Sequence, residues 1–260
     1  MSCTSVSSGS RPRPLRLRVL TYNIRHGEGL DGRIDLDRQA AVIRSCDPDL
    51  VALQEVDNRT RRTQNVDQTA ELERLTRLQA HFGPAMDFDG GQYGLAVLSR
   101  HPLPCSTVWA LPYSSSREPR VGLAVRVRLP AGAGELLFVC THLDYGPGSP
   151  DRLPQAEELE RLATATVGQS PAVLAGDLNS AVSGAPVRAL ARRWRLSCGQ
   201  EAAPTYPADA PQECIDHVLF RPADRWRVLA CQVLAEPVAS DHRPVLVELE
   251  LRPGPVVWPG

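Results

Sequence analysis

The feature that most constrains the fold of this sequence is a series of short apolar runs, each with polar side chains at its end. The runs that we expect to form strands are 15–24, 49–54, 93–99, 121–129, 136–140, 172–175, 214–220, 225–234 and 245–251. Alternating apolar and polar residues, or a short apolar run between turn residues, are typical of β-strands. The chain is therefore expected to be built mainly on β-sheets.

Four segments have helical spacing of their apolar residues instead: 36–44, 67–82, 154–167 and 186–194. Strands outnumber these helices, and hairpin-like neighbours are common. This favours two packed sheets flanked by helices over an alternating parallel βαβ fold. A chain of 260 residues is long enough for one large domain. With no repeat or linker apparent, we expect a single domain at 15–252, an N-terminal tail at 1–14 and a C-terminal tail at 253–260.

Charge and cysteine content exclude several classes of protein. The net charge of −1 provides no general attraction for nucleic acid or an anionic membrane. All 29 basic residues are arginine, which removes lysine-based covalent chemistry. The seven cysteines are scattered without CxxC spacing, so reduced thiols are expected. With no signal-peptide core and no apolar run long enough to span a bilayer, a cytoplasmic setting is the expectation.

Polar residues gather at the ends of the expected strands. They are Asn23, Glu55, His142, Asp177, Asn179, Asp216, Asp241 and His242, with Arg25, Arg117 and Arg120 in or near comparable positions. Each residue alone has a structural interpretation, as a turn cap, a solvated strand end or a satisfied core histidine. Eight such residues at strand ends are better explained by one convergent site.

The residue types at these strand ends suit a narrow chemistry. Carboxylates and an amide oxygen, without a cysteine or multi-histidine set, form a hard oxygen site that fits Mg²⁺ or Mn²⁺ better than zinc. Histidines and arginines beside such a metal can stabilise a pentacovalent phosphorane-like state and transfer protons. Attack of water on a phosphate ester is the reaction class that uses every member.

Six ordered motifs contain these strand-end residues: Tyr22-Asn23-Ile24-Arg25, Gln54-Glu55-Val56-Asp57, Thr141-His142-Leu143-Asp144, Gly176-Asp177-Leu178-Asn179, Ile215-Asp216-His217 and Ser240-Asp241-His242-Arg243-Pro244. The set resembles the motifs of the endonuclease/exonuclease/phosphatase superfamily. The segment 23–36, with Asp67-Gln68 downstream, most resembles its small bacterial members. The six motifs extend over about 17–250 in the expected order. The resemblance implies a deoxyribonuclease I-like α/β (α+β) fold. This is a four-layer α/β/β/α sandwich of two mostly antiparallel sheets, with the site at one edge.

The resemblance also implies roles for the catalytic residues. Asp177 is expected to orient or deprotonate the attacking water, and Asn179 to hold the phosphate. His242 is expected to contact the phosphate, with its imidazole oriented by Asp216. His142 is expected to assist the leaving oxygen.

The expected metal ligands are Glu55 as the main Mg²⁺ (or Mn²⁺) ligand, Asn23 close to the metal, and Asp241 as an additional acid. Phosphate-binding arginines are expected in addition to Asn179: Arg25 and one of Arg117 and Arg120, with the spacing to the next strand favouring Arg120. The segment Thr205-Tyr206-Pro207 resembles a substrate-proximal loop motif of the same superfamily.

Three functions remain open from the sequence. The first is a divalent-metal phosphodiesterase or phosphatase acting on a small or lipid-derived phosphate ester. The second is a deoxyribonuclease I-type nuclease, although no insertion rich in basic and aromatic residues is present to grip a duplex. Arginines at 59, 61, 62 and 117 either line one rim of the site or form a solvated face. The third is a catalytically silent binding module, which would be expected to lose Glu55, Asp177 or His242.

Substrate specificity is expected to lie in the loops 57–67, 110–119, 144–154 and 199–213.

Overall fold

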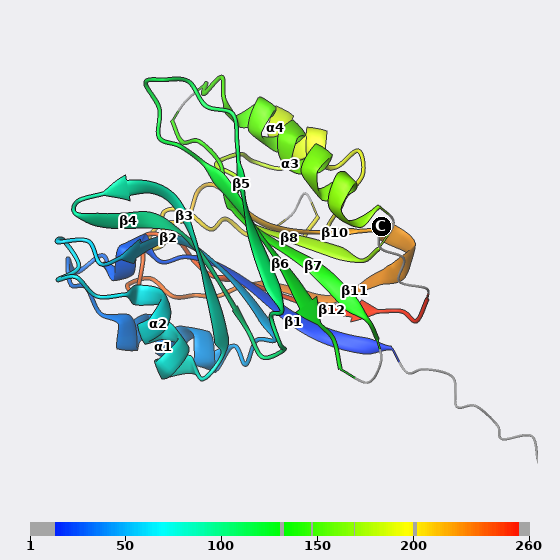
Figure 1. The fold of residues 1–260 in the computed structure, drawn as a ribbon, viewed down its shortest axis with the longest axis horizontal. Helices are drawn as coiled ribbons and strands as arrows, with labels where there is room; N and C mark the ends of the chain where they lie inside the picture. Colours follow the sequence, from blue (N-terminus) through cyan, green and yellow to red (C-terminus); the bar gives the residue numbers. More distant parts are fainter. Residues whose placement is uncertain (1–13, 131–132, 147, 169, 200–201, 255–260) are drawn as a thin grey trace, which may run out of the picture.

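Two six-stranded sheets form the centre of the molecule (Figure 1). The computed structural model describes residues 14–130, 133–146, 148–168, 170–199 and 202–254. Most of both expected tails, at 1–13 and 255–260, lies outside the described residues. The segment from 15 to 252 contributes strands to both sheets from its beginning to its end.

The first sheet has the strand order β11 (Trp226–Val233), β12 (Val245–Leu251), β1 (Leu15–Asn23), β2 (Leu50–Asn58), β4 (Gly91–Ser99), β3 (Gln79–Phe88). The second has the order β5 (Cys105–Ala110), β6 (Val121–Arg128), β7 (Glu135–His142), β8 (Ala172–Asp177), β10 (Asp216–Arg221), β9 (Arg195–Leu196). The pairs β1–β2 and β7–β8 are parallel, whereas the other described strand pairs are antiparallel. The expectation of two mostly antiparallel sheets is confirmed.

Strand alternation produces three apolar layers. In β1, Leu17 and Val19 point into the core between the two sheets, whereas Leu20 and Tyr22 point to the outer face. Successive residues of a strand face opposite sides of the sheet, so one strand contributes to two layers. Helices α1 (Leu36–Ser45) and α2 (Gln68–Thr76) cover the outer face of the first sheet.

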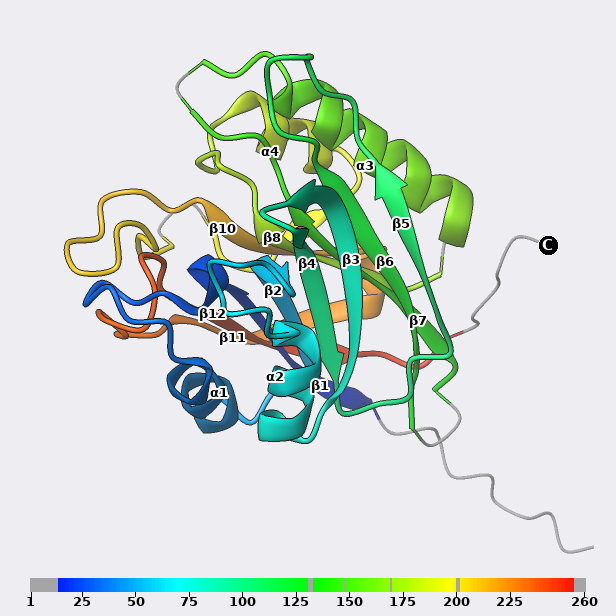
Figure 2. The same ribbon diagram turned by 60° about the vertical axis from the view of Figure 1, so that its left-hand side comes forward.

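The second sheet is covered in the same way by α3 (Arg152–Val167) and α4 (Ala185–Leu190), as Figure 2 shows. Short 3-10 helices lie at Arg25–Gly27 and Ala223–Arg225. The molecule is therefore a four-layer α/β/β/α sandwich, as expected. No helix among the described residues is long and apolar enough to cross a bilayer.

The expected helix over 67–82 is wrong in its second half. Helix α2 ends at Thr76, and Arg77 takes a left-handed conformation (φ 61°) that terminates the helix. The chain then forms β3, which pairs with β4 along its length. Helical spacing of leucines continues past the true end of α2, but sheet pairing overrides that local preference. Strands β5 and β9 were likewise not expected, and α4 ends at Leu190 rather than near 194.

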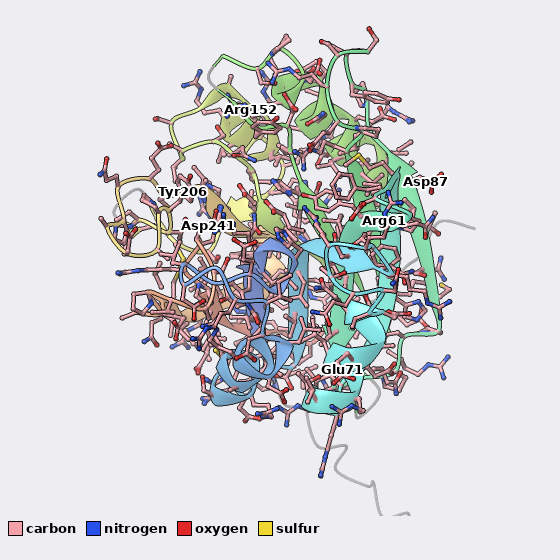
Figure 3. All side chains as sticks on the ribbon, turned by 90° about the vertical axis from the view of Figure 1, so that its left-hand side faces the viewer. Arg61, Glu71, Asp87, Arg152, Tyr206 and Asp241 are labelled. Carbon is pink, nitrogen blue, oxygen red and sulfur yellow. A yellow bond between two sulfur atoms is a disulfide. The ribbon has the colours of Figure 1, made fainter. Side chains whose placement is uncertain are left out.

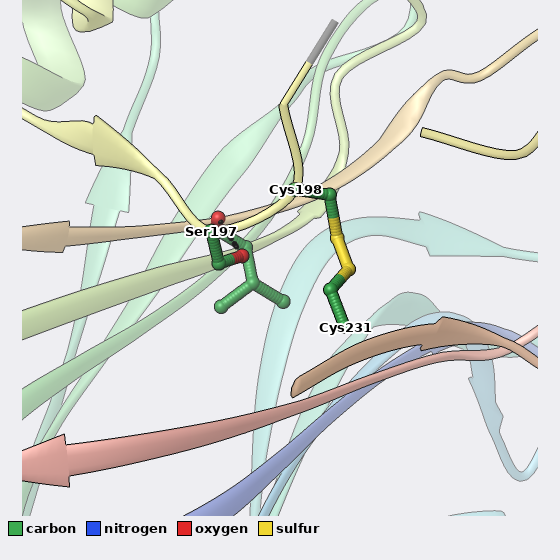
Figure 4. The surroundings of a disulfide bond; sticks show 4 residues. Ser197, Cys198 and Cys231 are labelled. Atoms are coloured by element: carbon green, nitrogen blue, oxygen red, sulfur yellow. Dashed lines mark hydrogen bonds between the residues drawn. A yellow bond between two sulfur atoms is a disulfide. The ribbon is translucent and has the colours of Figure 1, made fainter. Parts of the chain in front are cut away.

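A disulfide between Cys198 and Cys231 corrects the expectation that all cysteines are reduced (Figure 4). Cys198 follows β9 and Cys231 lies in β11, which are edge strands of different sheets. The bond therefore ties together the edges of the two sheets. Cys46, Cys105, Cys140 and Cys214 are free.

Removing this disulfide is expected to destabilise the fold. The two cysteines are 33 residues apart. Loop-closure entropy for that separation gives about 3–4 kcal/mol, or a fall in Tm of roughly 6–16 °C for a chain of this size. A Cys198→Ser/Cys231→Ser variant should show this loss in thermal unfolding, and the wild type should show it under reductant. Cys105→Ser, at an exposed free cysteine, should leave Tm unchanged; equal Tm values for all variants would contradict the prediction.

Candidate active site

Strand direction explains why the polar strand ends meet. Because β7 and β8 are parallel, their carboxyl ends lie together, and His142 is paired in register with Asp177. Strand β10 is antiparallel to β8, so its first residue, Asp216, is also opposite Asp177. In the other sheet, Asn23 at the end of β1 is opposite Gln54 of parallel β2. The topology thus brings five of the expected motifs to one edge of the sandwich.

The turn after β8 depends on a close approach between strands. A Cβ atom on Gly176 would lie 1.9 Å from the carbonyl oxygen of Thr141, so only glycine fits there. Asn179 follows with a φ of 46°, an uncommon conformation for a residue with a side chain. Its backbone N–H donates to Asp177 Oδ1 at 2.8 Å. This turn fixes both polar side chains of the Gly-Asp-Leu-Asn motif.

Glu55 reaches the site through an irregularity in β2. The register between β2 and β4 shifts between Leu53 and Val56, and Glu55 has a φ of 57°. A bulge of this kind redirects a side chain out of the strand's regular alternation. The Asn23 amide donates to Glu55 Oε1 at 3.0 Å and to Asp177 Oδ2 at 3.3 Å. Asn23 thus links the carboxylates contributed by the two sheets.

His242 lies in the loop that leads into β12. The Ser240 hydroxyl donates to the Asn23 carbonyl oxygen at 2.7 Å and holds this loop against β1. His242 Nδ1 is 2.9 Å from Asp216 Oδ2, and the Tyr206 ring packs on the imidazole at 4.8 Å between centroids. Burial alone would lower the pKa of His242, but the charges of Asp216 and Asp177 raise it to about 10. His242 is therefore a cation at neutral pH.

His142 has the opposite protonation preference. Burial, followed by the charges of Arg120 and His242, lowers the pKa of His142 well below its usual value. Its Nε2 lies 3.4 Å from Asp177 Oδ2 and 3.1 Å from Asn179 Nδ2. Burial and then the charge of Asp216 raise the pKa of Asp177 to about 7. The site thus contains a cationic imidazole, a neutral imidazole and a carboxylate that exchanges a proton near neutrality.

These side chains lie in a cleft of about 1150 Å³. The expected site residues that line it are Glu55, Arg120, His142, Asp177, Asn179, Asp241 and His242. Asn23 and Asp216 lie behind this wall, hydrogen-bonded to the lining residues. Figure 3 shows Tyr206 and Asp241, which line the cleft, close together on one side of this face, and Arg152 above them.

The expected phosphate-binding arginines divide into two groups. Arg120 is almost fully buried in the cleft wall, and its guanidinium pairs with Glu118 at 3.0 Å. Arg117 lies in a neighbouring hollow, beside Asp144 and the Tyr145 carbonyl oxygen. Arg25 does not line the cleft but lies next to Asp241, with 3.8 Å between the charged groups. Of the three arginines, only Arg120 lines the cleft.

The cluster of Asp177, Asp216 and His242, whose ligand atoms lie within 4.8 Å of one another, differs from the expected metal ligands. Within this cluster the Asp216 carboxylate is already hydrogen-bonded to His242 Nδ1 at 2.9 Å, an arrangement that suits an oriented imidazole that donates or accepts protons. Glu55 fits a divalent cation better. It is a half-buried carboxylate in the cleft, and no arginine or histidine of the described residues forms an ion pair with it. Glu55 and the cleft carboxylate of Asp241 are hard oxygen donors of the kind that Mg²⁺ or Mn²⁺ prefers. The Asn23 amide nitrogen faces Glu55, so this side chain would have to turn its oxygen away from the Arg25 backbone N–H to join them.

Some residues that line the cleft lie outside the expected motifs and loops, among them Met86 and Phe88 of β3 and Tyr93 of β4. Tyr145, Arg152 and Leu153 also line it, and they lie within 144–154, one of the loops expected to hold the specificity. Arg152, the first residue of α3, donates to the backbone carbonyls of Asn179 and Gly146 and so braces the loop after β8. Among the arginines suggested for the rim, Arg62 lines the cleft and Arg61 does not. Strand patterns do not reveal which loop residues fold over a site.

The family model described as "Endonuclease/Exonuclease/phosphatase family" matches residues 20–242. Among solved structures, an endonuclease/exonuclease/phosphatase from Beutenbergia cavernae is 30% identical with a TM-score of 0.77, over 93% of this chain and 73% of that chain. A mannosyl-6-phosphatase from Bacteroides thetaiotaomicron is 18% identical (TM-score 0.73; 90% of this chain, 99% of that chain). The human Nocturnin catalytic domain is also 18% identical (TM-score 0.74; 91% and 94%). No curated protein matches the chain.

Proposed function

The chain belongs to the endonuclease/exonuclease/phosphatase family, whose members are metal-dependent phosphoesterases or nucleases, and we propose that it hydrolyses a small or lipid-derived phosphate ester. As a member of this family, it is an enzyme that acts on ester bonds. The observation that supports the finer proposal is the charge of the cleft. Its acidic lining residues are Glu55, Glu118, Asp177, Glu213 and Asp241, and its cationic lining residues are Arg62, Arg120, Arg152 and His242, so the cleft has no excess of positive charge.

This balance is unfavourable for a long polyanion. Nucleic-acid binding draws its affinity from arginines and lysines placed along the phosphate backbone. Here each cleft arginine already has a protein partner, Arg62 in Asp57, Arg120 in Glu118 and Arg152 in backbone carbonyls, so few of their donors remain for a row of phosphates. A substrate with few phosphates suits such a cleft better than a duplex does. A deoxyribonuclease I-type nuclease is therefore the second candidate, and it rests on family membership.

In the proposed mechanism, Asp177 receives the proton of the attacking water. As the water oxygen forms its bond to phosphorus, the proton passes to the Asp177 carboxylate and the ester P–O bond breaks. The pKa of about 7 makes this carboxylate a stronger base than an ordinary aspartate. Asn179 and Asn23 orient the reacting groups, and the leaving oxygen collects a proton from solvent.

The two histidines have separate roles in this proposal. His242, held as a cation by Asp216, stabilises the negative charge that grows on the phosphate oxygens. His142, which is neutral, hydrogen-bonds to the leaving side of the phosphate. Glu55, with Asn23 and Asp241, would hold a divalent cation, whose charge further stabilises the phosphate oxygens. Glu55, Asp177 and His242 are all present, so a catalytically silent module is not favoured.

A substrate screen tests the proposal. Purified protein would be assayed with Mg²⁺, Mn²⁺ or EDTA on phosphomonoesters, phosphodiesters, phospholipid head groups, and supercoiled and single-stranded DNA. An Asp177→Asn/His242→Ala variant controls for contaminating activity. Turnover of small esters by the wild type alone supports the proposal. Nicking of DNA without turnover of small esters would replace it with the nuclease alternative.

A further inference from the structure

We propose that Arg62, stacked on Phe88 beside Tyr93, anchors a second anionic group of the substrate, separate from the phosphate that is hydrolysed. This inference deepens the proposed function and rests on it. It concerns one arm of the cleft, which we call the Arg62 arm and define by Arg62, Met86, Phe88, Tyr93 and Tyr145.

Hydrogen bonds to Asp57 and Asp89 fix the position of Arg62. Its Nε and Nη2 donate to the two carboxylate oxygens of Asp57 at 2.6 and 2.7 Å, and Asp57 is fully buried. Thr60 donates a further hydrogen bond to Asp57 at 2.6 Å. The Arg62 backbone N–H donates to Asp89 at 2.7 Å. A guanidinium fixed in this way loses little conformational entropy when it binds a ligand.

The same guanidinium presents an unused donor. It lies 4.5 Å from the Phe88 ring centroid and 5.7 Å from that of Tyr93, so one face is covered by aromatic surface. Within the described part of the chain, Nη1 donates to no protein acceptor, although the side chain is 31% exposed and lines the cleft. Guanidinium N–H groups prefer carboxylate or phosphate oxygens to neutral acceptors. An anionic group is therefore the partner that this donor fits best.

The Arg62 arm and the reacting centre belong to one cleft, which Glu55, Arg120 and His142 also line. Arg120 connects the two, because its guanidinium lies 5.8 Å from the centroid of the Tyr145 ring of this arm. A substrate whose phosphate lies between Glu55 and His142 would thus extend past Arg120 toward Arg62. Binding energy gained at a remote group of this kind raises specificity for substrates that carry the group.

Two ligands that differ only in a carboxylate test the inference. They are 6-phosphogluconate and sorbitol 6-phosphate, which share a six-carbon chain and a terminal phosphate. Binding is measured by calorimetry with Mg²⁺ in an Asp177→Asn background, where turnover does not interfere. We expect 6-phosphogluconate to bind roughly 10- to 100-fold more tightly, as a charge-assisted hydrogen bond would give. A further Arg62→Gln substitution should remove this preference, and Arg62→Lys should retain part of it.

Arg61 provides the matched control. It is the adjacent arginine, is 74% exposed and pairs with Asp89 rather than lining the cleft. Arg61→Gln removes the same charge and should keep the preference for 6-phosphogluconate. Absence of binding, equal binding of the two esters, or equal weakening of both by Arg62→Gln would each overturn the inference. The binding test and the hydrolysis screen can also give different answers. If the preference depends on Arg62 but the wild type hydrolyses no phosphate ester, the proposed function is refuted and the anion subsite is retained.

Discussion

Replacing Asp177 by asparagine is expected to lower kcat by about 10²- to 10⁴-fold, the range that a positioned general base contributes. Asparagine preserves the shape of the side chain and can still accept the hydrogen bond from the Asn179 backbone, but it cannot take a proton from water. The measurement is steady-state hydrolysis of the best ester found in the screen, with the wild type and the variant purified in parallel.

Stability separates this catalytic effect from a folding defect. Burial and the charge of Asp216 disfavour the ionised form of Asp177, so a neutral isostere removes an unfavourable charge. Tm of Asp177→Asn should therefore be no lower than that of the wild type. Glu213→Gln, at another carboxylate of the cleft wall, should keep kcat within a few-fold. Activity of Asp177→Asn within tenfold of the wild type would contradict its role as the base.

Replacing His242 by alanine is expected to lower kcat by a comparable amount, about 10²- to 10³-fold, because the variant lacks the cationic donor to the phosphate.

Replacing Asp216 by asparagine should lower kcat less than His242→Ala does, and it should also change the pH dependence of kcat. Asp216 Oδ2 lies 2.9 Å from His242 Nδ1, and its charge has the largest effect among the three carboxylates that raise the pKa of His242 to about 10. Removing that charge lowers the pKa, so the imidazole loses its proton at lower pH.

The pH profile distinguishes these two variants. Activity that needs the cationic form is present below the pKa of His242 and is lost as pH rises through it. In Asp216→Asn the alkaline fall in kcat should therefore begin at lower pH than in the wild type, with neutral-pH activity partly retained. His242→Ala should be poorly active at every pH. If Asp216→Asn lowered activity uniformly without moving the alkaline limb, Asp216 would not act through the charge of His242.

Much of the fold and the composition of the site follow from local patterns in the sequence. Strands such as β1 and β8 are short apolar runs that end on Asn23 and Asp177, and parallel pairing brings such ends together. The hydrogen bond between His242 and Asp216 matches the expected relationship of this pair. The roles of these residues stay predictions until the variants are assayed.

Features that depend on long-range contacts could not be predicted. The leucine spacing of α2 continues into residues that pair with β4 instead, because packing in the sheet overrides the local helical preference. The Cys198–Cys231 bond joins edge strands of different sheets, which no cysteine spacing indicates. Arg62 lies in the cleft stacked on Phe88, which is distant from it in the sequence and contacts it only in the folded chain.

The central claim is that this cleft hydrolyses a phosphate ester with a divalent cation held at Glu55. The most direct test is the hydrolysis rate of metal-stripped wild type as Mg²⁺ or Mn²⁺ is returned, measured beside Glu55→Gln. We expect no turnover in EDTA, full recovery with added metal, and a metal requirement in Glu55→Gln that is higher by more than the roughly 10- to 100-fold typical for loss of a group that only supports a metal ligand. Undiminished turnover in EDTA, or the same metal dependence in Glu55→Gln as in the wild type, would contradict the claim.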